Sequence, residues 1–141
     1  MTTPAPLLRL MQGMRADLIG YGQLKMLLEN QFEAALHHRG EKLEEIAQAI
    51  LALADSLEER RRERVALAAE ILGPGEDISI AAVFRQFPEN RRQALESGWQ
   101  VLEGLARECK ALNERNGRLL MDQHEIMKYV LDGEADTYAP A

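Results

Sequence analysis

Apolar residues recur along this chain at alternating intervals of three and four positions, which is the spacing of one face of an amphipathic helix. The first stripe runs from Leu7 to Ala35 and predicts a helix over residues 5–38. A second stripe of the same kind predicts a helix over residues 41–72. The Gly73-Pro74-Gly75 sequence that follows is a strong turn signal and ends this second helix.

Two further helices are predicted in the second half of the chain. A short one over residues 79–87 has Ser79 as its cap and an apolar side made of Ile80, Val83, Phe84 and Phe87. Pro88 then opens a last helix over residues 89–131, which would be roughly 65 Å long at the rise of an α-helix. A helix of that length does not fit inside a compact domain of this size.

The pattern therefore predicts an all-α fold: an elongated antiparallel bundle or coiled coil of three long helices with a short linker helix. We expect residues 1–131 to form one domain, with the linker helix plugging one end of the groove that a two-helix hairpin leaves open. Residues 132–141 combine Gly, Pro and acidic side chains and are expected to be a flexible tail.

Composition narrows the possible partners and location. The chain has 141 residues, of which 46% are apolar and 28% charged, as in one soluble domain. Its net charge of −6 argues against nucleic acid or an anionic lipid surface as a partner. No apolar run approaches the length that spans a bilayer, so stable membrane insertion is not expected. The start, MTTPAPLLRL, lacks a secretory signal, and the expected location is the cytoplasm.

Candidate chemistry is sparse. The histidines His37, His38 and His124 form no Glu-x-x-His pair of the kind that builds a metal site in a helical bundle. Cys109 lies on the apolar stripe of the last helix and is interpreted as a small buried hydrophobe rather than a nucleophile. No catalytic pair of carboxylates stands out. We therefore expect neither enzymatic activity nor a cofactor, with a helical-bundle enzyme or cofactor binder as the less favoured alternative.

The charged run DSLEERRRER, residues 55–64, permits two interpretations. Four arginines, Arg60, Arg61, Arg62 and Arg64, would form a basic patch if they shared one surface. The run also carries four acids, and Glu–Arg pairs three or four residues apart stabilise an exposed helix face. The balanced charge favours the exposed face.

The apolar seam of the last helix becomes polar partway along. One heptad position holds Leu102, Cys109, Asn116, Gln123 and Val130, and the other holds Leu105, Leu112, Leu119 and Ile126. A buried amide in such a seam fixes the register of the packed helices. The alternative is that residues 113–131 form a docking strip whose partner is often absent. Apolar residues after the amides spread over more than one face, which suits such a strip: Leu119, Leu120, Met121, Ile126, Met127, Tyr129, Val130 and Leu131.

The octet Asn113-Glu114-Arg115-Asn116-Gly117-Arg118-Leu119-Leu120 resembles the Asn-x-x-Asn-Gly-x-Leu signature of the FlgN family. These are bacterial flagellar chaperones of the type III export system. The layout of long helices and a short linker helix is similar to that of the family over residues 7–131. The tail Asp136-Thr137-Tyr138 matches the family's carboxyl terminus only in part, because the usual glycine does not follow.

The resemblance implies a cytosolic chaperone for the hook-associated proteins, which form the hook–filament junction. It would bind their carboxyl-terminal helical segments, prevent premature aggregation or assembly, and deliver them to the cytosolic domain of the flagellar export gate. The last helix would be the client-binding part, through Asn113, Asn116, Gly117, Leu119, Leu120, Gln123 and Met127. Tyr129 is the candidate contact with the export gate. The alternative is a homodimeric structural coiled-coil protein without flagellar clients, in which Asn116 faces its symmetry mate.

Overall fold

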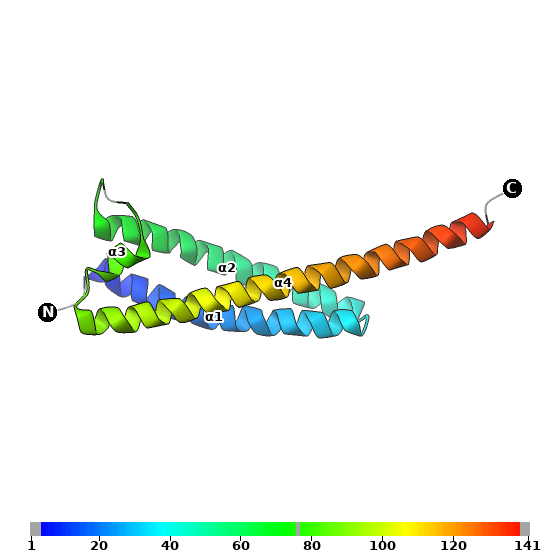
Figure 1. Ribbon diagram of the computed structural model, residues 1–141, viewed down its shortest axis with the longest axis horizontal. Coiled ribbons are helices and arrows are strands. Elements are labelled where there is room, and N and C mark those ends of the chain that lie inside the picture. Colours follow the sequence, from blue (N-terminus) through cyan, green and yellow to red (C-terminus); the bar gives the residue numbers. More distant parts are fainter. Residues whose placement is uncertain (1–3, 76, 139–141) are drawn as a thin grey trace.

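The computed structural model describes residues 4–75 and 77–138, with side chains described as far as Ile126 and again at Lys128. Its elements are all helices, in the order α1 (Ala5–Leu36), α2 (Gly40–Leu72), α3 (Ile80–Phe84) and α4 (Glu89–Tyr138) (Figure 1). The predicted all-α class, with three long helices and one short one, is confirmed.

Two helix ends differ from the prediction by more than two residues. α3 stops at Phe84, because the amides of Gln86 and Phe87 donate to carbonyls three residues back and so form a tighter turn. α4 does not end at 131 but continues to Tyr138. Gly133 costs a helix only about 1 kcal/mol, and the next residue that cannot continue a helix is Pro140. Helix thus covers the first part of the predicted tail, while its last residues, 139–141, lie outside the described ones.

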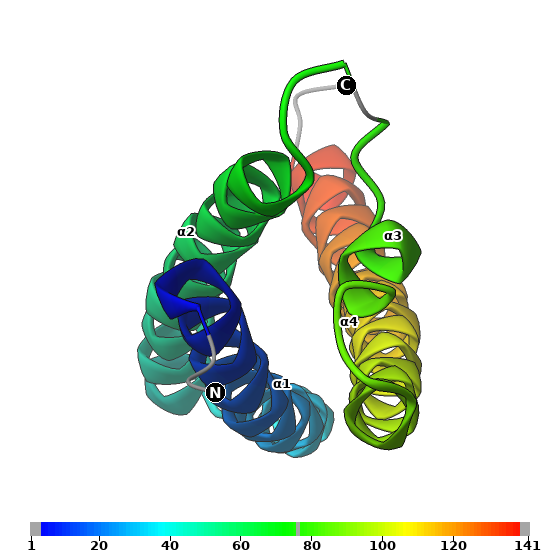
Figure 2. The ribbon, with the colours of Figure 1, turned by 90° about the vertical axis from the view of Figure 1, so that its left-hand side faces the viewer.

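α1 is the central helix of the bundle. It packs against α2 in an antiparallel hairpin and against α4 in parallel, because α4 reverses direction once more after α3 (Figures 1 and 2). Among the described residues, no Cα atom of α2 comes within 8 Å of one in α4. The three helices are therefore an open arrangement around α1 rather than a closed triangle.

The main apolar core lies at the end of the bundle where α3 sits. α3 contacts both α2 and α4 (Figure 1), and its Val83 belongs to the same apolar cluster as Leu7 and Leu10 of α1. The buried members of this core come from α1, α2, α3 and the turn after α3: Leu7, Leu10, Leu67, Ala68, Val83 and Phe87. Leu95 of α4 packs against them and is partly buried. Ser79 caps α3 as expected, because its hydroxyl accepts a hydrogen bond from the Ala82 amide at 3.0 Å. The prediction that the linker helix plugs one end of the bundle is confirmed.

Candidate functional site

The seam between α1 and α4 contains three polar side chains at successive heptad positions of α4. Each donates a hydrogen bond to a backbone carbonyl of α1 that lies 88 positions earlier in the chain. The pairs are Cys109 Sγ with Tyr21 at 3.5 Å, Asn116 Nδ2 with Leu28 at 2.7 Å, and Gln123 Nε2 with Ala35 at 2.9 Å. The constant offset shows that α1 and α4 keep one parallel register over this length.

Asn116 is the best-satisfied of these side chains. It is only 1% exposed, and its Nδ2 also donates to Gln31 Oε1 at 2.9 Å. Its Oδ1 accepts from the guanidinium of Arg115, which itself covers the ring of Phe32 at 3.7 Å. A buried amide with this many partners fits one alignment of the two helices, since a slip would leave its polar atoms unpaired. Asn116 therefore fixes the register of α4 on α1, as the first interpretation of the sequence has it.

The other residues of the predicted client-binding set differ in how far they are exposed. Asn113 and Gly117 are exposed, whereas Leu119 and Leu120 are half-buried and Gln123 meets α1. The side chains of Met127 and Tyr129 lie outside the described ones. The client-binding role of the whole set stays a prediction, and in this structure the amides of Asn116 and Gln123 are occupied by α1.

α4 projects well beyond the hairpin of α1 and α2 (Figure 1). Because Gln123 lies opposite Ala35 and α1 ends at Leu36, residues 124–138 extend past it, roughly 22 Å of helix. Large apolar side chains are exposed just before and just after the point where this projection begins: Met121 is 62% and Ile126 is 65% exposed. Beyond residue 123, α4 has no neighbour among the described residues, so an apolar side chain such as Ile126 is free to contact a partner.

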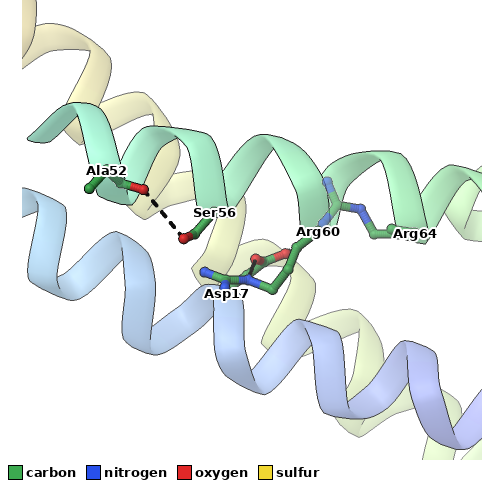
Figure 3. Close-up of polar contacts among 5 residues, drawn as sticks. All are labelled: Asp17, Ala52, Ser56, Arg60 and Arg64. Atoms are coloured by element: carbon green, nitrogen blue, oxygen red, sulfur yellow. Dashed lines mark hydrogen bonds and ion pairs between the residues drawn. The ribbon is translucent and has the colours of Figure 1, made fainter.

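A buried charged cluster lies between the helices near their middle, and the sequence did not reveal it. Asp17 of α1 is 1% exposed, and its two carboxylate oxygens accept from Arg60 Nε and Arg64 Nη1, both at 2.6 Å. The two arginines project from successive turns of α2 (Figure 3), and Ser56 one turn earlier bonds back to the Ala52 carbonyl. Charge-assisted bonds of this length are the strong ones, and they tie α2 to α1.

The arginines of the charged run are thus divided between the interior and the surface. Arg61 and Arg62 bind Glu58, as expected for an exposed face, and these bonds lower the pKa of Glu58 to about 2. Arg60 and Arg64 are directed inward, so the exposed-face interpretation is wrong for these two. The signal was present in the spacing, because Leu57, Arg60, Arg64 and Leu67 follow the three–four pattern. Val65, the apolar residue that directly follows the charged run, is 44% exposed.

Arg64 also links α2 to α4. Its guanidinium lies 5.1 Å from the centre of the Trp99 ring, and Phe84 of α3 meets the same indole edge-on at 6.5 Å. Nearby, Tyr21 has a raised pKa, first because it is partly buried and second because Asp17 is close. This cluster connects all four helices although α2 and α4 do not pack directly.

The described residues offer little for catalysis. Cys109 is 3% exposed, and burial raises the pKa of its thiol, which opposes formation of the nucleophilic thiolate. No three His, Cys, Asp or Glu side chains gather within the described part of the chain in a way that could hold a metal ion. Over the same residues, no helix combines the length and apolar character needed to cross a membrane.

Comparison with known families supplies the identity that the geometry leaves open. The model of a family described as FlgN protein matches residues 7–132, which is most of the chain. The chain belongs to the FlgN family. The FlgN family is the family of flagellar export chaperones and not a family of enzymes. Neither the curated proteins nor the solved structures gave a match.

Membership gives the seam and the projection of α4 a functional context. The matched region contains the Asn-x-x-Asn-Gly octet and extends to residue 132, about halfway along the projecting part of α4. A flagellar export chaperone acts by binding substrates of the export system. The exposed apolar residues of α4 are therefore the first place to look for that binding.

Proposed function

We propose that this FlgN-family chaperone binds the carboxyl-terminal helical segments of hook-associated proteins in the cytoplasm. It keeps them from aggregating or assembling early and delivers them to the cytosolic domain of the export gate. The observation that carries the proposal is the projection of α4 past α1, with Ile126 exposed on it and Met121 exposed just before it.

An amphipathic client helix would cover this projecting surface. Helix-in-groove recognition uses apolar anchors at intervals of three, four and seven residues, and Leu119 and Ile126 stand seven apart on α4. Methionine adapts to more than one partner, so Met121 suits a surface that receives different clients. The polar side chains on the same helix moderate the affinity, since a fully apolar strip would release its client slowly.

Delivery requires a second contact that remains free while the client is bound. Tyr129 is the candidate for contact with the export gate, because it lies on the projecting part of α4, away from the hairpin. A large, rigid aromatic side chain can provide much of the energy of a small interface. The side chain itself lies outside the described ones, and the assignment rests on its place in the helix.

The proposal is tested by calorimetric titration of the full-length protein with synthetic carboxyl-terminal segments of the hook-associated proteins. We expect one-to-one binding with a micromolar or lower Kd, weakened at least about tenfold in Ile126→Asp. Ile19→Asp is the matched control, because Ile19 on α1 is also 65% exposed but far from the projection. Its Kd should be unchanged.

The competing function is a homodimeric structural coiled coil, in which the apolar projection pairs with a second copy. A tight homodimer that gives no heat with either segment would contradict the chaperone proposal and favour the structural one. Sedimentation of the wild-type chain and of Ile126→Asp distinguishes the two, since only the structural coiled coil loses its dimer in the variant.

A further inference from the structure

One side of the bundle is open along much of its length. α2 and α4 both pack on α1, but packed helices lie about 8–10 Å apart and these two do not approach each other that closely. A groove occupies the space between them, with a floor from α1 and walls from α2 and α4. Its lining residues are Tyr21, Leu24, Leu28, Ile50, Ala54, Ala106, Cys109, Lys110 and Asn113.

The position of α3 indicates what kind of element can pack on this side of the bundle. α3 lies between α2 and α4 at one end, where Val83 is 0% and Phe84 is 1% exposed (Figures 1 and 2). The filled part ends at Trp99, which Phe84 meets from α3 and Arg64 meets from α2. Beyond it the groove continues without a covering helix among the described residues. A short amphipathic helix, packed like α3, would therefore fill the open part of the groove.

The residues that line the groove indicate what kind of ligand it would bind. Most of the nine lining residues are apolar, and Ala54 and Ala106 are small, so another helix can approach closely. Lys110 is the only charged side chain among them, and Asn113 adds one amide at the rim. The complement of this surface is an apolar helical stripe bordered by a carboxylate.

We infer that the open part of this groove is a binding site for the export client. The client would bind as an amphipathic helix that lies in line with α3, as a fourth helix of the bundle, and a carboxylate of the client would contact Lys110. This inference rests on the proposed function and deepens it. It assigns part of the client-binding surface to α2, through Ile50 and Ala54, whereas the family resemblance places that surface on α4. It also gives Asn113 a role different from that of Asn116, because Asn113 faces the groove and Asn116 faces α1.

The decisive variant is Ala54→Trp, because Ala54 belongs to α2 and its indole would fill the groove without changing α4. Titration of the full-length variant with the client segments should give a Kd at least about tenfold higher than that of the wild type. Ala66→Trp is the matched control: Ala66 is also an exposed alanine of α2, outside the groove lining, and its Kd should change less than about twofold. If the wild type and Ala54→Trp bind the client equally and Ile126→Asp does not bind it, binding in the groove is contradicted and the proposed function stands. Absence of binding by the wild type overturns both.

A photo-crosslinking measurement avoids dependence on a bulky substitution. A benzophenone side chain at position 50, in the groove, should crosslink to the client segment, whereas one at position 65, on an exposed part of α2, should not. Crosslinking from position 50 only to a second copy of the chain would overturn the inference in favour of self-association. The carboxylate is tested by Lys110→Glu, which should raise Kd about two- to fivefold, with Arg107→Glu as the exposed control on the same helix, outside the groove lining. An equal effect in the two variants would contradict a specific contact with Lys110.

Discussion

The Nδ2 of Asn116 on α4 lies 2.7 Å from the backbone carbonyl oxygen of Leu28 on α1, in a seam that is closed to water around it. The carbonyl already belongs to the hydrogen-bond ladder of α1 and uses its second lone pair for the amide. This bond lies between the matching bonds of Cys109 and Gln123, one heptad to either side. Polar side chains thus hold α1 and α4 in register, and among the described residues no buried side-chain nitrogen or oxygen lacks a hydrogen-bond partner.

Replacing Asn116 by aspartate tests this register bond with a change of almost no volume. In Asn116→Asp the donor to Leu28 becomes an acceptor, so we expect the free energy of unfolding at pH 7 to fall by about 1–3 kcal/mol. Urea denaturation at pH 7 measures this. Asn113→Asp, on the exposed side, should change stability by less than about 0.5 kcal/mol.

Two glycines of α1 provide a matched test of the packing beside the charged cluster. A Cβ at Gly20 would lie 2.7 Å from Arg60 Nη2 and 3.1 Å from Leu57 Cδ2, whereas one at Gly22 meets nothing within 4 Å. Gly22→Ala should therefore stabilise the protein by up to about 1 kcal/mol through helix propensity. Gly20→Ala should instead destabilise the protein, because the new Cβ would displace Arg60 from its hydrogen bond with Asp17, and this cost exceeds the gain in helix propensity. Thermal unfolding of both variants decides this, and an equal gain in the two would contradict the close packing.

The charged cluster itself is tested by shortening its arginines one at a time. Arg64→Met removes a 2.6 Å partner of the buried Asp17 and the contact with Trp99, and should lower the free energy of unfolding by about 1–3 kcal/mol. Arg62→Met should cost less than about 0.5 kcal/mol, because Arg62 is 75% exposed and pairs with Glu58 at the surface. Chemical denaturation measures both, and similar losses would contradict a special role for Arg64.

The burial of the Cys109 thiol predicts that the stability of the fold depends on pH. Burial raises the pKa of its thiol, with Glu108 adding to the shift and Lys25 opposing it. The folded state thus keeps the thiol proton that the unfolded state loses, so this group's contribution to stability should fall as the pH rises through the thiol range. Iodoacetamide at pH 8 should alkylate the native protein at least about 100-fold more slowly than the protein in urea. Comparable rates would show that the α1–α4 seam opens readily.

Periodicity predicted the helices and the polar seam because those depend on spacing within one segment. The octet around Asn116 also gave the family before any contact was known. Periodicity did not predict that Arg60 and Arg64 turn toward Asp17, since a run of mixed charge looks the same whether two of its members face inward or none does. Nor did it predict the groove, because the separation of α2 and α4 depends on how both pack on α1. The Gly, Pro and acidic residues of 132–141 predict a tail, but α4 continues to Tyr138 because only Pro140 among them cannot continue a helix.

The most direct test of the central claim is amide hydrogen exchange of the full-length chain with and without a carboxyl-terminal client segment. Without client, exchange should be slow along α4 where it packs on α1 and fast beyond residue 124, where α4 has no packing partner among the described residues. With client, the chaperone account predicts new protection of residues 113–128 of α4 and of residues 50–54 of α2. Exchange that is unchanged by saturating client in both segments would contradict it.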